Sequence, residues 1–409
     1  VSSAASDVYK RQSKGSLSAT AFSVTNCCWT DTISANLSGT GALTMSGGGT
    51  LILSGSNTYT GGTVLSAGTT QISADNNLGC DGSVSCGTAG SLTLSNAWLQ
   101  ILSDVTLTTA RGIILSTGAT GYINTNTHTL SYAGNISGSG NLYQTGGGGI
   151  SLSGATAYTG YTQIVNGTLT LSGSGAIANS YYLALYNSSV LDISATTSGT
   201  SIKSLYSSYT STGVALGAKP LSITNALGHE FYGVISSTST GGALSVTGGT
   251  QYLDGANTYT GSTTIGSGAT LAIYYTGALG YSGGSGSYSA NIVNNGTLDY
   301  WSSRNQTLSG VISGSGNLRL DSYAATLTLT NTNTYTGNTY INAGILQISD
   351  DRNLGAVPGS VTAGNISFGG GTLHPTENLT LAANRGISFG SGTINVNSTN
   401  TSSAPQQTI

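Results

Sequence analysis

The stretch Leu53-Ser-Gly-Ser-Asn-Thr-Tyr-Thr-Gly61 decides the fold, because the chain repeats it three more times. The other copies are Leu152-Ser-Gly-Ala-Thr-Ala-Tyr-Thr-Gly160, Leu253-Asp-Gly-Ala-Asn-Thr-Tyr-Thr-Gly261 and Leu329-Thr-Asn-Thr-Asn-Thr-Tyr-Thr-Gly337. After the second copy, apolar and polar residues alternate through Thr162-Gln-Ile-Val-Asn-Gly-Thr-Leu-Thr-Leu171, on both sides of a glycine. Alternation with a period of two that is broken by a glycine turn predicts a strand, a bend and a second strand.

Each copy lies within a longer unit. Ile136-Ser-Gly-Ser-Gly-Asn-Leu142 and Ile312-Ser-Gly-Ser-Gly-Asn-Leu318 precede two of the copies, and Asn77-Leu-Gly79 and Asn353-Leu-Gly355 follow two. A unit of this size cannot bury its apolar face alone and must stack on its neighbours. The sequence therefore predicts an all-β fold, a right-handed parallel β-helix (β-solenoid) of roughly 16–20 turns. Since the chain stops inside a partial repeat, we interpret it as a fragment of a longer rod.

The repeated string, followed by Thr-x-Ile-x-x-Gly-x-Leu-x-Ile and Leu-Gly, resembles the autotransporter-associated β-strand repeat. That repeat occurs in the passenger regions of bacterial type V secreted proteins. The resemblance is strongest over four repeat cores, near residues 37–79, 136–175, 235–280 and 312–355. It implies export through a C-terminal β-barrel translocator, absent from this sequence, to the outer membrane and cell surface of a Gram-negative-type bacterium or into the medium. Such passengers share a scaffold rather than a chemistry, so the resemblance assigns no activity.

The first residues do not follow the repeat. Residues 1–12 crowd three charged side chains together and look like a translated sequencing-library adapter, so we expect a non-native, disordered leader. Residues 13–409 are then expected to form a single continuous β-helix passenger.

Composition narrows the function classes. Charged residues make up 6% of the chain, the formal net charge is -3, and 37% of residues are hydrophobic. Disorder usually requires low hydrophobicity with high net charge, so an ordered β structure with a polar surface fits better. Without a basic stripe to neutralise phosphates we expect no nucleic-acid partner. The longest apolar runs are too short for a membrane span in this fragment.

Two cysteines accompany a lengthened loop. Cys80 and Cys86 follow the first Leu-Gly turn, where the fourth copy is two residues shorter and has no cysteine. A small disulfide staple between Cys80 and Cys86 fits an oxidising compartment. The alternative is two independent small residues.

No group of residues forms a recognisable reaction centre. The three histidines lie in different repeats, further apart than the one turn that a solenoid can bring together. The chain contains no Gly-x-x-x-x-Gly-Lys-(Ser/Thr) phosphate loop and no Gly-Gly-x-Gly-x-Asp calcium repeats. We therefore predict no catalytic residues, no cofactor and no metal site.

The four repeated tyrosines, Tyr59, Tyr158, Tyr259 and Tyr335, permit two interpretations. A row of tyrosines can form a stacking ladder for sugars, but a residue present in every repeat is explained more economically by the fold. We therefore predict that they are structural positions that pack over the corner before the next strand.

One patch departs from the scaffold at Thr297-Leu-Asp-Tyr-Trp301. If the apolar residues face inward, Asp299 and Trp301 point outward, and about one turn later so do Arg319 and Asp321. A tryptophan beside carboxylates and a guanidinium suits a glycan-binding groove, so these four residues are our candidate ligand site. The alternative is a cross-strand ion pair beside an exposed aromatic ring.

The leading functional hypothesis is a non-catalytic, surface-displayed or secreted passenger segment. It would act as a structural stalk or adhesin, binding host-cell or extracellular-matrix glycans and proteins, or environmental surfaces, through its Thr-, Asn- and Ser-rich exterior. The alternative is a β-helical polysaccharide-binding or -degrading protein, such as a lyase, a glycoside hydrolase or a phage tail spike. Such enzymes need several charged residues on one groove, whereas the thirteen Asp and Glu residues here are mostly scattered singly.

Overall fold

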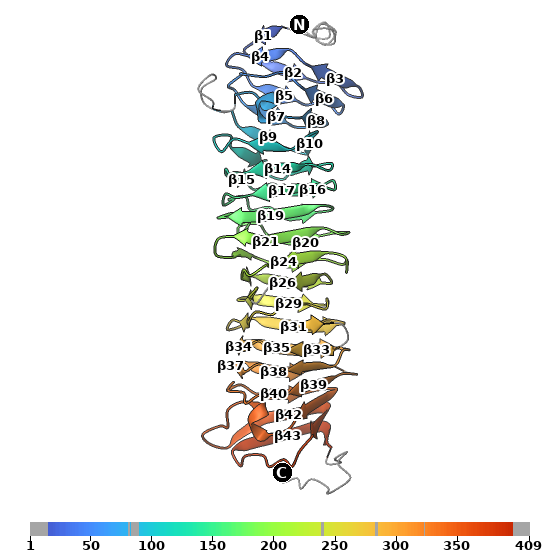
Figure 1. Ribbon diagram of the computed structural model, residues 1–409, viewed down its shortest axis with the longest axis vertical. Coiled ribbons are helices and arrows are strands. Elements are labelled where there is room, and N and C mark those ends of the chain that lie inside the picture. The colour runs from blue at the N-terminus through green and yellow to red at the C-terminus, as the bar shows by residue number, and fades with distance from the viewer. Residues whose placement is uncertain are drawn as a thin grey trace. The chain divides into compact units, whose positions relative to one another are not determined.

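The computed structural model describes residues 15–80, 82, 90–238, 241–282, 285–322 and 324–395. The fold is all-β, with parallel strands stacked as a β-solenoid of about 17 turns, which confirms the predicted fold class. The chain divides into two compact units, Val1–Ile202 and Lys203–Ile409, and within each unit strands of successive turns lie above one another (Figure 1). The continuity of one β-helix over residues 13–409 stays a prediction. Residues 1–12 lie outside the described residues.

Three parallel sheets form the sides of the first unit. One contains, in stacking order, β3 (Thr30–Ile33), β6 (Thr50–Leu53), β8 (Thr69–Ile72), β10 (Ala97–Ile101), β13 (Thr120–Asn124), β16 (Asn141–Thr145), β18 (Thr162–Ile164) and β20 (Leu183–Leu185). The second contains β2 (Phe22–Val24), β5 (Leu43–Met45), β7 (Thr63–Leu65), β9 (Leu92–Leu94), β12 (Ile113–Leu115) and β15 (Ile136–Gly138). The third contains β11 (Val105–Leu107), β14 (Thr129–Tyr132), β17 (Gly149–Leu152), β19 (Thr168–Gly173) and β21 (Val190–Thr196). The remaining elements are β1 (Ser16–Ser18), its parallel partner β4 (Asn36–Ser38), the short 3-10 helix η1 (Asp75–Leu78) and β22 (Thr200–Ile202).

The second unit is built in the same way. One row of parallel strands is β25 (Leu221–Ile223), β28 (Leu244–Val246), β30 (Thr263–Ile265), β34 (Ile292–Asn294) and β37 (Ile312–Ser313). Another is β26 (Ala226–Phe231), β29 (Gly249–Leu253), β31 (Thr270–Tyr275), β35 (Thr297–Ser302), β38 (Asn317–Leu320), β40 (Thr339–Ile341) and β42 (Thr362–Pro375). A further row, β33 (Ser285–Tyr288), β36 (Gln306–Leu308), β39 (Thr326–Leu329) and β41 (Ile345–Ile348), also ends on the long β42. The other elements are β23 (Leu205–Tyr206), β24 (Gly213–Ala215), β27 (Val234–Ser236), β32 (Tyr281–Ser282), which pairs antiparallel with β33, η2 (Asp351–Leu354) and β43 (Arg385–Ile394).

The alternation of the sequence decides which side chains fill the interior. In β10, Leu99 and Ile101 are completely buried, whereas Trp98 and Gln100 alternate with them on the outer, partly exposed side. Each buried Leu or Ile stabilises the fold by about 1.5–3 kcal/mol relative to an exposed one. A one-residue slip would turn the apolar set outward, so the pattern also fixes the register between turns.

The asparagine of the repeated stretch ties three successive turns together. Asn57 is buried, its Oδ1 accepts a hydrogen bond from the N–H of Leu37 at 2.8 Å, and its Nδ2 donates to the carbonyl of Asn77 at 2.6 Å. Asn257 and Asn333 make the corresponding bonds in their own repeats. Buried backbone groups at the corner, where no strand partner is in reach, are satisfied by this side chain.

Two of the repeats each have a buried arginine that binds their 3-10 helix and Leu-Gly turn. Arg111 is fully buried, and its Nε donates to Oδ1 of Asp75 in η1 at 2.8 Å. The other guanidinium nitrogens donate to five backbone carbonyls, those of Asp75, Leu78, Gly79, Cys80 and Gly90. Arg385 repeats this arrangement with Asp351 of η2, at 2.7 Å. A buried guanidinium is tolerated in such a place because its charge and its donors all have partners.

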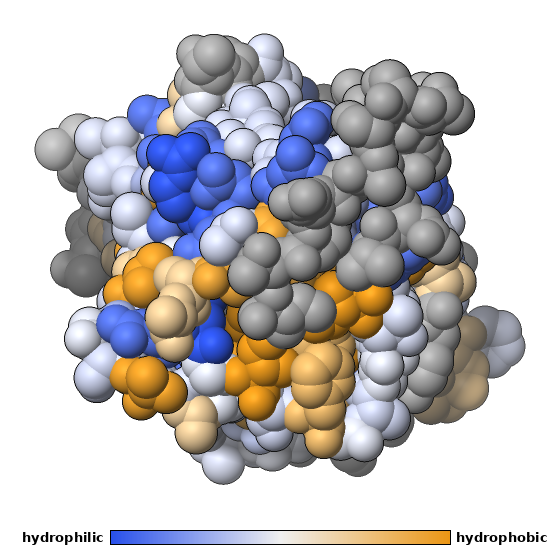
Figure 2. Space-filling model, turned by 90° about the horizontal axis from the view of Figure 1, so that it is seen from below, coloured by the Kyte–Doolittle hydropathy of each residue, from blue (hydrophilic) through white to orange (hydrophobic). Residues whose placement is uncertain are grey.

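Apolar side chains also reach the surface at the end of the second unit formed by β42 and β43. Figure 2, a view onto that end, shows hydrophobic residues in orange beside hydrophilic ones. Phe389 of β43 is 54% exposed and stacks on Phe368 of β42, with ring centroids 4.5 Å apart.

Candidate functional site

The four repeated tyrosines lie in the interior. Tyr59, Tyr158 and Tyr259 are 0% exposed and Tyr335 is 1% exposed. Each hydroxyl is hydrogen-bonded to the threonine four residues later, at 2.5 to 2.8 Å. Burial raises the pKa of Tyr335 to about 12 and shifts the other three in the same direction. With no ring face open to solvent, none of these tyrosines offers a surface for a sugar.

The structure describes one of the two cysteines of the predicted disulfide. Cys80 is buried, and its sulfur is disulfide-bonded. Cys86 lies outside the described residues, so the pairing of Cys80 with Cys86 stays a prediction.

The four residues of the predicted ligand site do lie together, on the outer side of β35 and β38. Asp299 pairs directly with Arg319 in the parallel register. The Nη2 of Arg319 donates to Oδ2 of Asp321 at 2.8 Å, and the other oxygen of Asp321 accepts from Asn342 at 2.6 Å. Tyr274 is the register partner of Trp301, and Asp254 lies next to Tyr274, directly after β29. We call these two residues, together with Asp299, Trp301, Arg319 and Asp321, the Trp301 face.

Aromatic rings form the exposed part of the Trp301 face. Trp301 is 39% exposed and meets the ring of Tyr274, its register partner on β31, edge to face at 5.2 Å. Tyr274 also contacts Tyr252 at 5.2 Å and Tyr275 at 4.3 Å, and Tyr275 is 52% exposed. Packing against Tyr274 holds the indole in place and leaves part of its surface open to solvent.

Two carboxyl groups of this face have raised pKa values. Burial, together with the negative charge of Asp321, raises the pKa of Asp299 to about 7. Burial and the charge of Glu230 do the same for Asp254, whose pKa also rises to about 7. Asp254 is 1% exposed and therefore out of reach of a ligand, whereas Asp299 is partly exposed. When protonated, Asp299 is able to donate a hydrogen bond to a ligand oxygen.

The site predicted from the sequence did not include Asp254, although the residue at this position differs from those in the other copies of the repeated stretch. The third copy of the repeated stretch has Asp254 where the other copies have Ser54, Ser153 and Thr330. A carboxyl in a position that otherwise holds a hydroxyl marks a departure from the scaffold.

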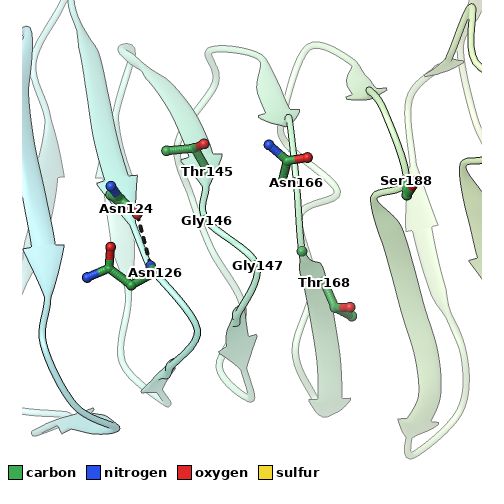
Figure 3. Close-up of a pocket in the computed structure, with 9 residues that line it drawn as sticks. Asn124, Asn126, Thr145, Gly146, Gly147, Asn166, Thr168 and Ser188 are labelled. Atoms are coloured by element: carbon green, nitrogen blue, oxygen red, sulfur yellow. Dashed lines mark hydrogen bonds between the residues drawn. The ribbon is translucent and has the colours of Figure 1, made fainter.

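A second surface, in the first unit, is an open groove of about 660 Å³ that spans several successive turns (Figure 3). We call it the Asn124 groove, and it is lined by Asn124, Asn126, Thr145, Gly146, Gly147, Asn166, Gly167, Thr168 and Ser188. The Oδ1 of Asn124 accepts from the backbone N–H of Asn126 at 2.9 Å, which fixes one wall. The lining carries amides, hydroxyls and glycine backbone and no ionisable side chain, so it suits a neutral polar ligand. The sequence pattern did not predict this groove.

The described part of the chain contains no group of three or more His, Cys, Asp or Glu side chains arranged to hold a metal ion. Within the same residues, none of the helices combines the length and apolar character needed to cross a membrane.

The fold and its repeated corner define a β-solenoid repeat protein, and comparison with known proteins identifies the repeat. The family described as Passenger-associated-transport-repeat matches residues 38–72, 142–171, 248–273 and 313–348. The chain therefore carries four of these repeats and resembles autotransporter passenger regions, as the sequence predicted.

A curated relative agrees with this assignment. The chain is similar to the adhesin BmaC autotransporter of Brucella suis biovar 1 (strain 1330), with 36% identity over 161 residues. The match covers 36% of this chain and 4% of the relative's length. No solved structure matches. The repeat family and this relative support a cell-surface or secreted location, as predicted.

Proposed function

We propose that the chain is a non-catalytic passenger segment that adheres to host or environmental surfaces through its exterior. The observation that carries the proposal is the similarity to an autotransporter named as an adhesin. The similar region covers 36% of this chain and 4% of that relative. The solenoid supports it, because a stack of turns presents a long, sparsely charged polar surface on which many weak contacts add up.

The test is adhesion by the purified chain. Beads coated with it are incubated with cultured epithelial cells, with extracellular-matrix proteins and with abiotic surfaces, and retention under flow is measured against beads coated with a protein of similar size. We expect retention above the control on at least one surface. Equal retention everywhere would refute the adhesive role.

We also propose that the Trp301 face contributes to adhesion by binding glycans. Trp301 would stack on a sugar ring, while Asp299 and Arg319 would hydrogen-bond its hydroxyls. Trp301→Ala and Asp299→Ala are expected to weaken binding to the same glycans on an array. Arg352→Ala, a change in an exposed ion pair away from this face, is the matched control.

The second candidate function is polysaccharide cleavage. The observation that favours it is the partly exposed carboxyl of Asp299, which lies beside Arg319 in the register and has a pKa raised to about 7. Release of reducing sugar, or of an unsaturated product absorbing in the ultraviolet, from a panel of polysaccharides would establish it. Release that is unchanged by Asp299→Asn would exclude this carboxyl as its source.

A further inference from the structure

We infer that the first unit binds a neutral polysaccharide chain along the Asn124 groove and the adjoining Trp98 pocket. The Trp98 pocket, of about 230 Å³, is lined by Thr69, Trp98, Gln100, Asn124 and Thr145. Asn124 and Thr145 line both hollows, so the two form one elongated site. This inference rests on the proposed adhesive function and names a ligand class and a place for it.

A row of aromatic rings ends on Trp98, which lines the site. Trp98, Tyr122 and Tyr143 are register partners on β10, β13 and β16. Trp98 stacks on Tyr122 with ring centroids 4.6 Å apart and an interplanar angle of 22°, and Tyr122 meets Tyr143 at 5.1 Å. The row fixes the orientation of the indole at its end.

The outer face of that indole has no aromatic neighbour in the register. On the side away from Tyr122, Trp98 pairs with Thr69 of β8, a small side chain that lines the same pocket. Stacking of a sugar ring against an aromatic face buries apolar C–H groups without requiring charge. The exposed face of Trp98 above Thr69 is therefore the stacking position for one sugar unit.

A row of amides runs beside the aromatic row. The Nε2 of Gln71 donates to Gln100 at 2.7 Å, the Nε2 of Gln100 donates to Asn126 at 2.9 Å, and Asn126 donates to the carbonyl of Ile101 at 2.7 Å. This chain of bonds fixes the orientation of three amides, each of which has both donor and acceptor capacity. Preorganised amides beside an aromatic face are suited to the hydroxyl groups of a saccharide.

The charge of this region selects among ligand classes. None of the residues that line the two hollows is Asp, Glu, Lys, Arg or His. An acidic polysaccharide or a nucleic acid would find no cation here to balance its charge. A peptide added as an extra strand would need a free sheet edge, whereas β10, β13 and β16 are each paired on both sides. A neutral polysaccharide is the remaining long polar ligand.

The dimensions also suit a polymer. The lining residues come from six successive turns, from Thr69 to Ser188. With strands about 4.8 Å apart, the site is on the order of 24 Å long, enough for several sugar units in a row.

The test measures binding of soluble neutral polysaccharides to the full chain by calorimetry and by tryptophan fluorescence. Dextran, mannan, galactomannan and β-1,3-glucan are the probes, and hyaluronate and heparin are the acidic comparison. We expect at least one neutral polymer to bind and Trp98→Ala to weaken that binding about tenfold or more. Trp29→Ala, which removes an indole that is 69% exposed elsewhere in the same unit, is expected to leave affinity unchanged.

A second variant keeps the test independent of folding. Thr69→Tyr would extend the aromatic row over the free face of Trp98, which preserves packing and blocks the stacking position. We expect it to lose binding while its unfolding temperature stays at or above that of the parent chain. Binding to the acidic polymers only, or affinity for neutral polymers that neither variant changes, would overturn the inference.

The inference and the adhesive function fail separately. Coated beads that adhere although no neutral polysaccharide binds would refute this site and leave adhesion standing. Polysaccharide binding that depends on Trp98, together with beads that adhere nowhere, would support the site and refute the adhesive role.

Discussion

The guanidinium of Arg111 lies 2.8 Å from the carboxylate of Asp75, an ion pair between residues 36 apart in the sequence. The same pair recurs as Arg385 with Asp351 at 2.7 Å. In both, the arginine side chain is completely buried and also holds the carbonyls of the Leu-Gly turn. The pair therefore locks a 3-10 helix and the following turn onto a later part of the solenoid.

Removal of this arginine is expected to be costly. Arg111→Met would leave the carboxylate of Asp75, whose side chain is only 12% exposed, without its cation and five carbonyls without their donor, so the free energy of unfolding should fall by about 3–5 kcal/mol. Urea denaturation followed by circular dichroism measures it. Arg352→Met, which breaks the pair with Asp350 at the surface, should change stability by less than about 1 kcal/mol. Equal effects of the two variants would contradict the buried role of Arg111.

The corner asparagines offer a second test. Asn57→Ala would remove two buried hydrogen bonds and leave the N–H of Leu37 and the carbonyl of Asn77 unpaired, at a cost of about 2–4 kcal/mol. Ser56→Ala, at the exposed position next to it, should cost less than about 0.5 kcal/mol. Midpoints of thermal unfolding would show the difference, and a tolerated Asn57→Ala would mean that water replaces the side chain.

Two glycines allow the stability cost of backbone strain to be measured separately from that of steric overlap. Gly167 and Gly118 have φ angles of +80° and +69°, so an alanine at either position is strained. An added Cβ at Gly167 would overlap the carbonyl oxygen of Gly148, whereas at Gly118 it would meet nothing within 4 Å. Gly118→Ala should cost about 1 kcal/mol and Gly167→Ala at least twice as much. Chemical denaturation of both variants measures the two losses of stability. Similar losses would show that the turns have room to move apart.

The pH dependence of stability should report on Asp254. Folding raises the pKa of this carboxyl from 3.8 to about 7, by burial and by the charge of Glu230. The folded state thus favours the protonated form, so the stability that Asp254 supplies is present in full below pH 3.8 and is lost as pH rises through about 7. Asp254→Asn should therefore be more stable than the parent at pH 8, on the order of 1–3 kcal/mol, with the gain shrinking toward pH 4.

Unfolding curves recorded from pH 4 to pH 8 would check this. Glu377→Gln, at an exposed position, serves as the control and should not change the profile. A parent chain and an Asp254→Asn variant with parallel profiles would show that Asp254 is ionised in the fold.

Much of the fold could be predicted because it depends on short-range pattern. The alternation around Leu169 and Leu171 determines strands and their buried side directly. The position of Asp299 beside Arg319 could be predicted as well, because the two residues are 20 apart, about one turn.

What could not be predicted depends on turns of unequal length. Thr69 and Trp98 are register partners although they lie 29 residues apart, whereas Trp98 and Tyr122 lie 24 apart and Tyr122 and Tyr143 lie 21 apart. Counting residues along the sequence therefore does not place Thr69 beside Trp98. The partner of Arg111 was hidden for the same reason, since Asp75 lies 36 residues before it.

The asparagine that bonds to the turn before and the turn after it has a kinetic consequence. A finished turn already presents the backbone groups that the next segment must meet, so each new turn can add onto the last without a search for distant partners. Loop closure then costs no more than about one turn at a time, whatever the total number of turns. The solenoid can then fold one turn after another, which suits a chain that emerges gradually from one end.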